Sequence, residues 1–304
     1  MQKGIYHVPV MLHEVIDGLQ VKPDGIYVDC TFGGGGHSKA ILSKLNQNGR
    51  LLAFDQDEDA KPNVPKDDRL TFIPHNFRYL QRFLRLHKIA KVNGVLADLG
   101  VSSYQVNEPT RGFSFRFDAP LDMRMDQRQN LTASEIITKY PEEKLHKVFE
   151  MYGEVTNAKT LAKTIVNVRH SMPLHTINEF KNAIQPVIKG SPHKYFAQVF
   201  QAIRIELNDE FGALKEMLAQ LPGVLEPGGR VAIVTFHSLE DRIVKNFFKN
   251  GSSEQNEPDE VYGTKLKNTL TVITKKPILP GVNEIKDNPR ARSAKLRIAE
   301  RSYD

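Results

Sequence analysis

The sequence has little cysteine, no long apolar stretch and no low-complexity or repeated segment. Its single cysteine, Cys30, excludes an intrachain disulfide and a zinc site built from cysteines. No segment approaches the roughly 20 apolar residues of a membrane span. The first residues carry His and Glu where a signal peptide needs an apolar run. These absences predict a cytoplasmic protein with no membrane partner and no bound metal ion.

The charge of the chain favours one class of partner. Among its 304 residues, 42 are Lys or Arg and 36 are Asp or Glu, which gives a formal net charge of +6 and a pI of about 9.2. A basic chain favours a polyanionic partner such as nucleic acid. Many basic proteins bind nothing anionic, so the charge favours a nucleic-acid partner without establishing one.

Short apolar runs alternate with helical segments in the first third of the chain. The run 26–30 stops at a glycine cluster, a helix is predicted over 38–45, and the run 51–55 ends on an acid. The runs 70–73 and 93–99 continue the pattern. Strands that alternate with helices predict an α/β fold with a parallel, doubly wound sheet.

The alternation breaks after residue 99. The next convincing strand, 229–236, lies about 130 residues further on, which is far beyond a usual crossover. We therefore predict a discontinuous sheet domain, 1–105 and 200–304, interrupted by an inserted helical domain, 106–199. The predicted helices are 141–151, 157–170, 176–188 and a long segment, 194–220.

Two local patterns complete this prediction of the fold. The helix 176–188 opens with a capping box from Thr176 to Glu179. The last two predicted strands, 268–274 and 294–299, are separated by a short gap, which indicates an antiparallel pair.

The turn after the first predicted strand has the spacing of a cofactor site. Residues 29–38 read DCTFGGGGHS, in which Asp29, Gly33 and Gly35 fit the pattern acid-x-x-x-Gly-x-Gly. The dinucleotide pattern G-x-G-x-x-G does not fit, because neither register has its third glycine. The pattern that does fit suits S-adenosylmethionine, which has no phosphate and carries a sulfonium and an ammonium. Glycines let the backbone approach it, and a nearby carboxylate complements its charge.

A second acid supports the same cofactor. Asp55 ends the second predicted strand and offers two acceptors to the two ribose hydroxyls. The four glycines could instead form only a flexible turn, but strand, turn, helix, strand and terminal acid all occur in order. His37 fits either contact with the cofactor or capping of the following helix.

The ends of the later strands offer candidates for catalysis, since ligands of open α/β sheets bind there. Asp98 ends the fourth predicted strand and could accept hydrogens from an exocyclic base amine; the alternative is a helix cap or turn acid. Gln105 could contact either cofactor or base. After the fifth strand, Ser238 and Asp241 resemble a helix start. That interpretation leaves His237 unexplained, and His237 is the second catalytic candidate.

One segment interleaves aromatic and basic residues, as RNA-binding surfaces do. Residues 111–117 read RGFSFRF. Its phenylalanines could stack on unpaired bases and its arginines could hold phosphates. The alternative is a strand with phenylalanines in the core and solvated polar residues. The candidates for contact with RNA are Arg111, Phe113, Phe115, Arg116 and, further on, Arg124.

A second basic strip lies at 288–297, where Arg290 and Arg292 form either a phosphate-binding surface or an ordinary solvated face.

The single thiol bears on which atom of a base would receive a methyl group. Methylation of cytosine C5 needs a thiolate nucleophile, and Cys30 lies beside the glycine turn, away from the end of the fourth strand. We interpret Cys30 as core packing, which favours transfer to nitrogen or oxygen.

These segments together resemble the ribosomal RNA small-subunit methyltransferase H family over nearly the whole chain. The resemblance rests on eight stretches: residues 6–10 (YHVPV), DCTFGGGGHS at 29–38, LADLGVSS at 96–103, RGFSF and PLDMRMD within 111–126, FQAIRIELNDE at 200–210, FHSLEDRIVK at 236–245 and NPRARSAKLR at 288–297. Members of this family methylate N4 of a cytidine in the decoding centre. The resemblance implies a Rossmann-like class I S-adenosylmethionine-dependent methyltransferase sheet, an inserted helical domain for substrate recognition, and small-subunit rRNA or the 30S subunit as partner.

The resemblance also implies a set of contacts. Phe77 would lie against the adenine, and Asp98 would bind the cofactor. Gly34, Tyr104 and the segment 194–196 depart from the family's usual residues, and none of them removes a cofactor contact. The implied cofactor contacts are Gly35, Gly36, His37, Asp55, Phe77, Asp98 and Gln105.

Two other functions remain open. A nicotinamide-dependent oxidoreductase could be built on a similar sheet, and a non-enzymatic RNA-binding assembly factor could retain the fold. Affinity for NAD without affinity for S-adenosylhomocysteine would indicate the first. RNA binding without methyl transfer would indicate the second.

Overall fold

The computed structural model describes residues 9–251 and 268–303, so residues 6–8 of the family motif lie outside the described part. The chain forms two compact units. Unit 1 consists of Met1–Gly100 and Gly212–Asp304, and unit 2 is Val101–Phe211. Within the described ranges, no helix has the length and apolar character needed to cross a membrane.

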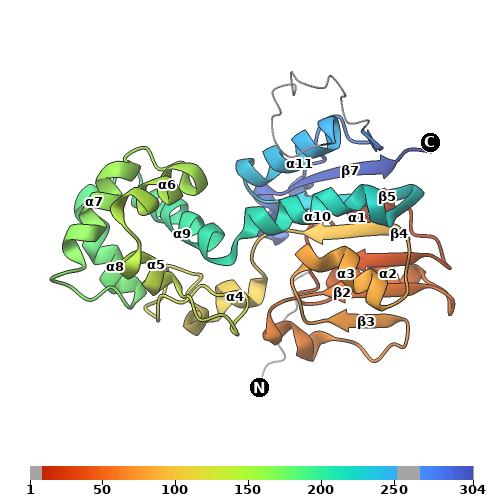
Figure 1. Cartoon of the computed structure of the whole chain (residues 1–304), viewed down its shortest axis with the longest axis horizontal. Helices are drawn as coiled ribbons and strands as arrows, with labels where there is room; N and C mark the ends of the chain where they lie inside the picture. Colours follow the sequence, from red (N-terminus) through yellow and green to blue (C-terminus); the bar gives the residue numbers. More distant parts are fainter. Residues whose placement is uncertain (1–8, 252–267, 304) are drawn as a thin grey trace. The chain divides into compact units, whose positions relative to one another are not determined.

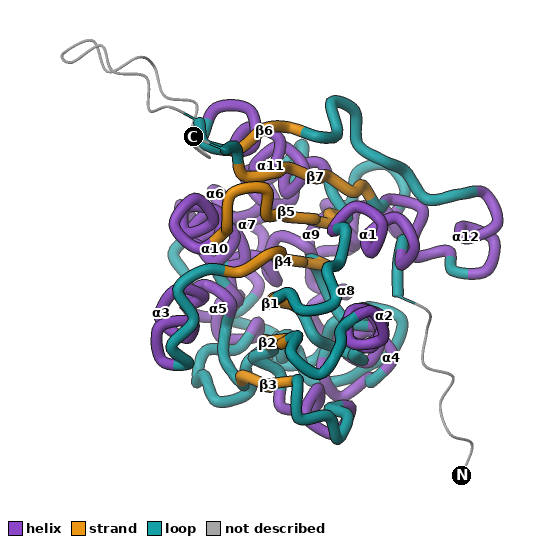
Figure 2. Tube along the Cα trace, turned by 90° about the vertical axis from the view of Figure 1, so that its right-hand side faces the viewer, coloured by secondary structure: helices purple, strands orange, loops and turns teal. Residues whose placement is uncertain are grey.

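Unit 1 is built on a seven-stranded sheet with the order β3-β2-β1-β4-β5-β7-β6 (Figures 1 and 2). Strands β1 to β5 are parallel to one another, whereas β7 is antiparallel to β5 and to β6. The predicted Rossmann-like, doubly wound sheet is confirmed, and so is the antiparallel last pair. The strands are β1 (Ile26–Asp29), β2 (Arg50–Phe54), β3 (Leu70–Ile73), β4 (Val92–Asp98), β5 (Leu225–Thr235), β6 (Leu270–Val272) and β7 (Lys295–Arg301).

Helices cover both faces of this sheet (Figure 2). On one face, α1 (Leu12–Leu19) and α2 (Gly36–Lys44) pack against the strands through a core that includes Ile41 and Leu51. The other face buries Leu218 and Phe248 among its neighbours, and both faces therefore exclude water from the sheet. The helices of this second face are α3 (Leu80–Leu86), α10 (Glu210–Val224) and α11 (Ser238–Asn250).

The strand order reverses between β1 and β4, and the glycine turn follows β1 at this switch point. Asp29 ends β1, Asp55 follows β2 directly, and Asp98 ends β4. Because these three strands are parallel neighbours, their acids share one edge of the sheet. This is the edge where open α/β sheets bind ligands.

Unit 2 is helical and has its own hydrophobic core, which includes Phe149, Leu161 and Phe180. The predicted helices at 141–151 and 157–170 are confirmed, and the one at 176–188 ends earlier as an α-helix and continues as a short 3₁₀ turn, Gln185–Val187. The helices of unit 2 are α4 (Ser103–Asn107), α5 (Ala133–Lys139), α6 (Glu142–Gly153), α7 (Ala158–Val168), α8 (Ile177–Ile184) and α9 (Pro192–Asn208).

Two details of the helices differ from the sequence prediction. The long helical segment predicted over 194–220 is helical in the structure, but Asp209 adopts φ 46° and divides it into α9 and α10. The sequence analysis also missed α5. Its signal was present, since Thr132 and Glu135 form a capping box of the same kind as the predicted Thr176–Glu179 box.

Candidate functional site

The glycine turn after β1 has a conformation that only small residues tolerate. Gly35 has φ 74°, in the left-handed region, and a Cβ there would lie 2.7 Å from the Phe32 ring. A Cβ on Gly36, the first residue of α2, would collide with the ring of Pro9. Gly35 and Gly36 therefore lie against the Phe32 ring and Pro9, where a larger residue would not fit.

Asp29 organises this turn from below. The carboxylate is buried; its Oδ1 accepts from the backbone N of Thr31 at 3.0 Å and its Oδ2 accepts from the Ser38 hydroxyl at 2.7 Å. Burial raises its pKa, and the hydrogen bond from Ser38 opposes that rise. Thr31 in turn accepts from the backbone N of Asp98 at 2.7 Å. Asp29 thus acts on the turn and on β4 through its neighbours, a role that the acid-glycine spacing did not reveal.

Asp55 holds the other side of the turn. Its Oδ2 accepts from the backbone N of Gly33 at 2.7 Å, and its Oδ1 accepts from the backbone N of Asp57 at 2.9 Å. The carbonyl of Gly33 also accepts from Asn63 Nδ2 at 3.0 Å. Burial raises the pKa of Asp55 to about 7. A carboxylate has about four acceptor positions, so two remain for ribose hydroxyls.

Asp98 differs from Asp29 and Asp55 in its hydrogen bonds. Its Oδ1 is buried and has no hydrogen-bond partner among the described residues, and its Oδ2 lies 3.7 Å from Nδ1 of His37. Burial, followed by the nearby carboxylates of Asp29, Glu240 and Glu284, raises the pKa of Asp98 well above its usual range. A buried acceptor without a donor is costly, so this position favours a ligand that supplies a donor or a positive charge.

Phe77, implied only by the family resemblance, belongs to the loop after β3. It opens the 3₁₀ turn Phe77–Tyr79 and is partly buried. The cap of that turn, Asn76, donates from Nδ2 to Gln56 Oε1 at 2.9 Å. Because Gln56 directly follows Asp55, this bond ties the loop of Phe77 to the loop of the ribose candidate. The structure brings Phe77 to the same edge, which local pattern could not indicate.

His237 has a role that the sequence analysis missed. It is the N-cap of α11, where its Nδ1 accepts from the backbone N of Glu240 at 3.4 Å. Glu240 bends back to accept from the backbone N of Phe236 at 2.9 Å. The helix start expected from Ser238 and Asp241 is confirmed, since Ser238 is the first residue of α11 and Asp241 lies in its first turn. A catalytic role for His237 stays a prediction.

Gln105 lies in unit 2 and is buried in the capping box of α4. Its Oε1 accepts from the backbone N of Ser102 at 2.9 Å, while the Ser102 hydroxyl accepts from the backbone N of Gln105 at 3.1 Å. This local role explains the pattern at 102–105. Contact of Gln105 with the cofactor stays a prediction.

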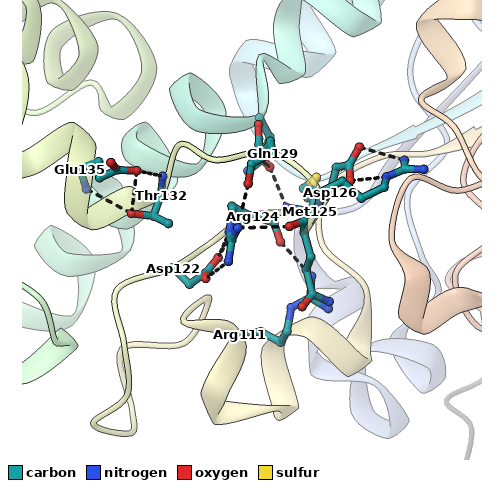
Figure 3. Close-up of polar contacts among 11 residues, drawn as sticks. Arg111, Asp122, Arg124, Met125, Asp126, Gln129, Thr132 and Glu135 are labelled. Carbon is teal, nitrogen blue, oxygen red and sulfur yellow. Dashed lines mark hydrogen bonds and ion pairs between the residues drawn. The ribbon is translucent and has the colours of Figure 1, made fainter.

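Two of the candidate RNA-binding arginines have extensive contacts inside unit 2 (Figure 3). Arg124 donates from Nε and Nη2 to both carboxylate oxygens of Asp122, at 2.9 and 2.7 Å, and from Nη1 to the carbonyl of Gln129 at 2.8 Å. Arg111 is buried and donates from Nη2 to the carbonyl of Arg124 at 2.8 Å. These guanidinium groups hold the 111–129 loop together, which favours structural roles for both.

The aromatic candidates pack against the core of unit 2. Phe113 and Phe115 are both partly buried against it, and the Phe115 ring lies 5.2 Å from His193 and 5.4 Å from Phe200. This arrangement favours the alternative of phenylalanines in the core. Arg116, by contrast, is exposed.

The basic strip near the C-terminus also divides. Arg292 is exposed and Arg290 is half-buried in the 3₁₀ turn Pro289–Ser293. Arg297 of the same strip is buried in β7 and forms a bidentate pair with Asp241 at 2.6 and 3.1 Å. Contact of Arg290 and Arg292 with phosphate stays a prediction.

Across the described ranges, no group of three His, Cys, Asp or Glu side chains is arranged to hold a metal ion.

Comparison with known proteins gives one consistent result. Residues 4–302 match the MraW methylase family. Proteins named ribosomal RNA small subunit methyltransferase H from Bacteroides thetaiotaomicron and Flavobacterium johnsoniae are 52% and 53% identical, and each alignment covers 97% of this chain and 97% or 98% of the relative. A solved rRNA methylase from Streptococcus thermophilus is 14% identical, with a TM-score of 0.40 and coverage of 99% of both chains. The resemblance inferred from the sequence motifs is confirmed, and the chain belongs to the MraW methylase family.

Proposed function

We propose that this protein is an S-adenosylmethionine-dependent methyltransferase of the cytoplasm that acts on N4 of a cytidine in small-subunit rRNA. The observation that carries the cofactor assignment concerns Asp98 Oδ1, which is buried at the edge that also carries Asp55 and has no hydrogen-bond partner among the described residues. The rRNA substrate is supported by relatives about 50% identical over nearly their whole length, which are named ribosomal RNA small subunit methyltransferase H.

The charge of the site fits a cationic cofactor. Asp29, Asp55 and Asp98 lie at the ends of adjacent parallel strands, and burial raises the pKa of each. A pyrophosphate beside these acids would meet repulsion, which disfavours the nicotinamide-dependent alternative. A sulfonium and an ammonium would instead relieve the deficit of positive charge at Asp98.

Each group of the cofactor has a candidate partner in unit 1. Asp55 would accept from the ribose hydroxyls with its remaining lone pairs, and Phe77 would lie against the adenine. The turn at 33–36, with His37, would receive the methionine part, and Asp29 would keep that turn in shape. When bound, the cofactor supplies an electrophilic methyl group.

Asp98 has two proposed roles, and both need its free oxygen. The first is a charge-assisted hydrogen bond to the cofactor. The second is acceptance of a hydrogen from the base amine, whose nitrogen lone pair is otherwise delocalised into the ring. Asp98→Asn separates the two roles. A higher Kd for the cofactor indicates the first, and a lower rate at saturating cofactor indicates the second.

Unit 2 is proposed to recognise the RNA. A base amine within folded RNA is accessible only when the nucleotide is unpaired or turned out of its stack. Among the candidates in this unit, Arg116 combines a positive charge with exposure, and Gln105 is kept as a candidate for contact with cofactor or base.

The decisive experiment maps small-subunit rRNA by mass spectrometry in a strain lacking this protein. We expect one N4-methylcytidine to disappear and to return when the wild-type chain, but not Asp98→Asn, is supplied. Transfer of tritium from labelled cofactor to naked rRNA, to 30S subunits and to DNA then identifies the substrate. Binding of NAD without S-adenosylhomocysteine, or of RNA without any transfer, would support one of the two alternatives instead.

A further inference from the structure

We propose that Phe117, presented beside Arg116, is a base-stacking residue for single-stranded RNA. The inference rests on the proposed function and deepens it by naming a substrate contact. Phe117 is 48% exposed, although phenylalanine is ordinarily buried. It follows an exposed arginine, whose guanidinium has no hydrogen-bond or ion-pair partner in the part of the chain that the structure describes.

The backbone immediately before this tip is anchored. The ring of Phe115 packs among His193, Phe196 and Phe200, with centroid distances of 5.2, 6.0 and 5.4 Å. The carbonyl of Phe115 accepts from Lys181 Nζ at 3.1 Å. The side chain of Phe115 therefore points into unit 2 and fixes the residue from which the tip starts.

The backbone immediately after the tip is anchored to the start of α8. Asp118 Oδ1 accepts from the backbone N of Asn178 at 3.0 Å, and the carbonyl of Ala119 accepts from the backbone N of Ile177 at 2.9 Å. Pro120 forms a β-bridge with Thr176, the cap of the same helix. Arg116 and Phe117 thus form a two-residue tip held at both ends.

A tip whose backbone is anchored at both ends is better suited to bind RNA than a flexible solvated loop would be. A fixed backbone lowers the entropy that must be lost when an exposed side chain binds. An aromatic ring can stack on any unpaired base, and an adjacent arginine can hold the neighbouring phosphate. Phe113 and Phe115, the stacking candidates expected from the sequence, have their rings against the core.

The test uses the full-length enzyme with rRNA fragments and 30S subunits. We expect Phe117→Ala to raise the Kd for RNA about tenfold and to raise KM for the RNA substrate more than it lowers kcat. Phe117→Tyr should retain most binding, whereas Phe117→Leu should lose it, because leucine has no ring. Arg116→Ala should reduce the log–log salt slope by ~0.7–0.9.

Met172→Ala is the matched control, because Met172 is an exposed apolar side chain of the same unit, 42% accessible. It should leave RNA binding unchanged, and all variants should keep wild-type Tm and affinity for S-adenosylhomocysteine. The stacking role is wrong if the wild-type enzyme transfers methyl groups normally and Phe117→Ala binds RNA as well as the wild type does. It is equally wrong if Phe117→Leu retains full RNA binding. If the wild-type chain itself binds no RNA and transfers no methyl group, the proposed function has failed instead.

Discussion

Nδ1 of His37 lies 3.7 Å from Oδ2 of Asp98. The other ring nitrogen, Nε2, lies 3.1 Å from the carbonyl oxygen of Val10, and burial lowers the pKa of His37. A neutral ring that donates to Val10 from Nε2 presents a lone pair at Nδ1. Asp98 Oδ2 therefore faces an acceptor, and no donor among the described residues reaches Asp98 Oδ1. A ligand with a hydrogen-bond donor or a positive charge would complement this carboxyl group.

This relationship predicts opposite effects of Asp98→Asn on stability and on binding. The folded pKa of Asp98 lies above its unfolded value, so ionisation destabilises the fold increasingly as pH rises from the unfolded pKa towards the folded one. The amide removes this cost and can donate to His37. We expect a Tm higher by roughly 2–4 °C per kcal/mol recovered, with a larger gain at pH 8 than at pH 5.

The same Asp98→Asn protein should bind S-adenosylmethionine at least tenfold more weakly, because a charge-assisted hydrogen bond is worth roughly 1.5–3 kcal/mol. Thermal unfolding at both pH values, with and without cofactor, measures both effects. A lower Tm for the variant at pH 8 would show that the folded protein already compensates this charge.

Asp55 predicts a pH dependence of ribose binding. Its pKa is raised to about 7 by burial, and the ionised carboxylate is the better acceptor for two hydroxyl hydrogens. Affinity should therefore increase as pH rises through 7. Adenosine is the cleanest probe, because it has both hydroxyls and no ionisable group between pH 6 and 8. We expect its Kd to be about fivefold to tenfold higher at pH 6 than at pH 8. A single titrating group changes the Kd at most about tenfold for each pH unit.

Two controls belong to this measurement. Asp55→Asn should bind adenosine weakly with a flat pH profile, and 2′-deoxyadenosine, which has one hydroxyl fewer, should show a shallower one with the wild-type chain. A wild-type profile that persists in Asp55→Asn would assign the titration to another group.

Thr31 predicts a positioning effect. Its hydroxyl accepts from the backbone N of Asp98 at 2.7 Å, so Thr31→Val leaves that donor unpaired at nearly constant volume. The free energy of unfolding should fall by about 1–3 kcal/mol, and the cofactor should bind more weakly because Asp98 is displaced. Thr31→Ser keeps the hydroxyl and should restore both quantities. Chemical denaturation and calorimetry provide the readouts, and equal behaviour of the Val and Ser variants would contradict the role.

Arg124 is expected to act within unit 2. Arg124→Ala removes both a cation and the bidentate pair with Asp122, whereas Asp122→Ala breaks the same pair and keeps the cation. Both variants should lower the free energy of unfolding, by roughly 1–3 kcal/mol each, and their effects should be less than additive in the double variant. Both should leave the salt slope of RNA binding unchanged. A smaller slope in Arg124→Ala alone would instead identify a phosphate contact.

Much of the fold could be predicted from local pattern. The runs at 26–30 and 70–73 are strands because apolar, β-branched residues end at turn formers, and alternation with helices requires parallel pairing. Parallel pairing brings strand ends to one edge, so Asp29, Asp55 and Asp98 could be grouped from the sequence alone. The break at Asp209 could not be predicted, because a single left-handed residue leaves the helical periodicity on both sides intact.

The sequence by itself determined the family, the class of cofactor and the edge of the sheet that carries the acids, because these depend on spacing along the chain. Tertiary structure decided which acid is free. Asp29 receives hydrogen bonds from Thr31 and Ser38, whereas Asp98 Oδ1 receives none from the described residues. It also decided that Phe115 packs inward while Phe117 is exposed. A hydrogen-bond partner or a packing neighbour is set by residues distant in the sequence, and these meet only when the chain folds.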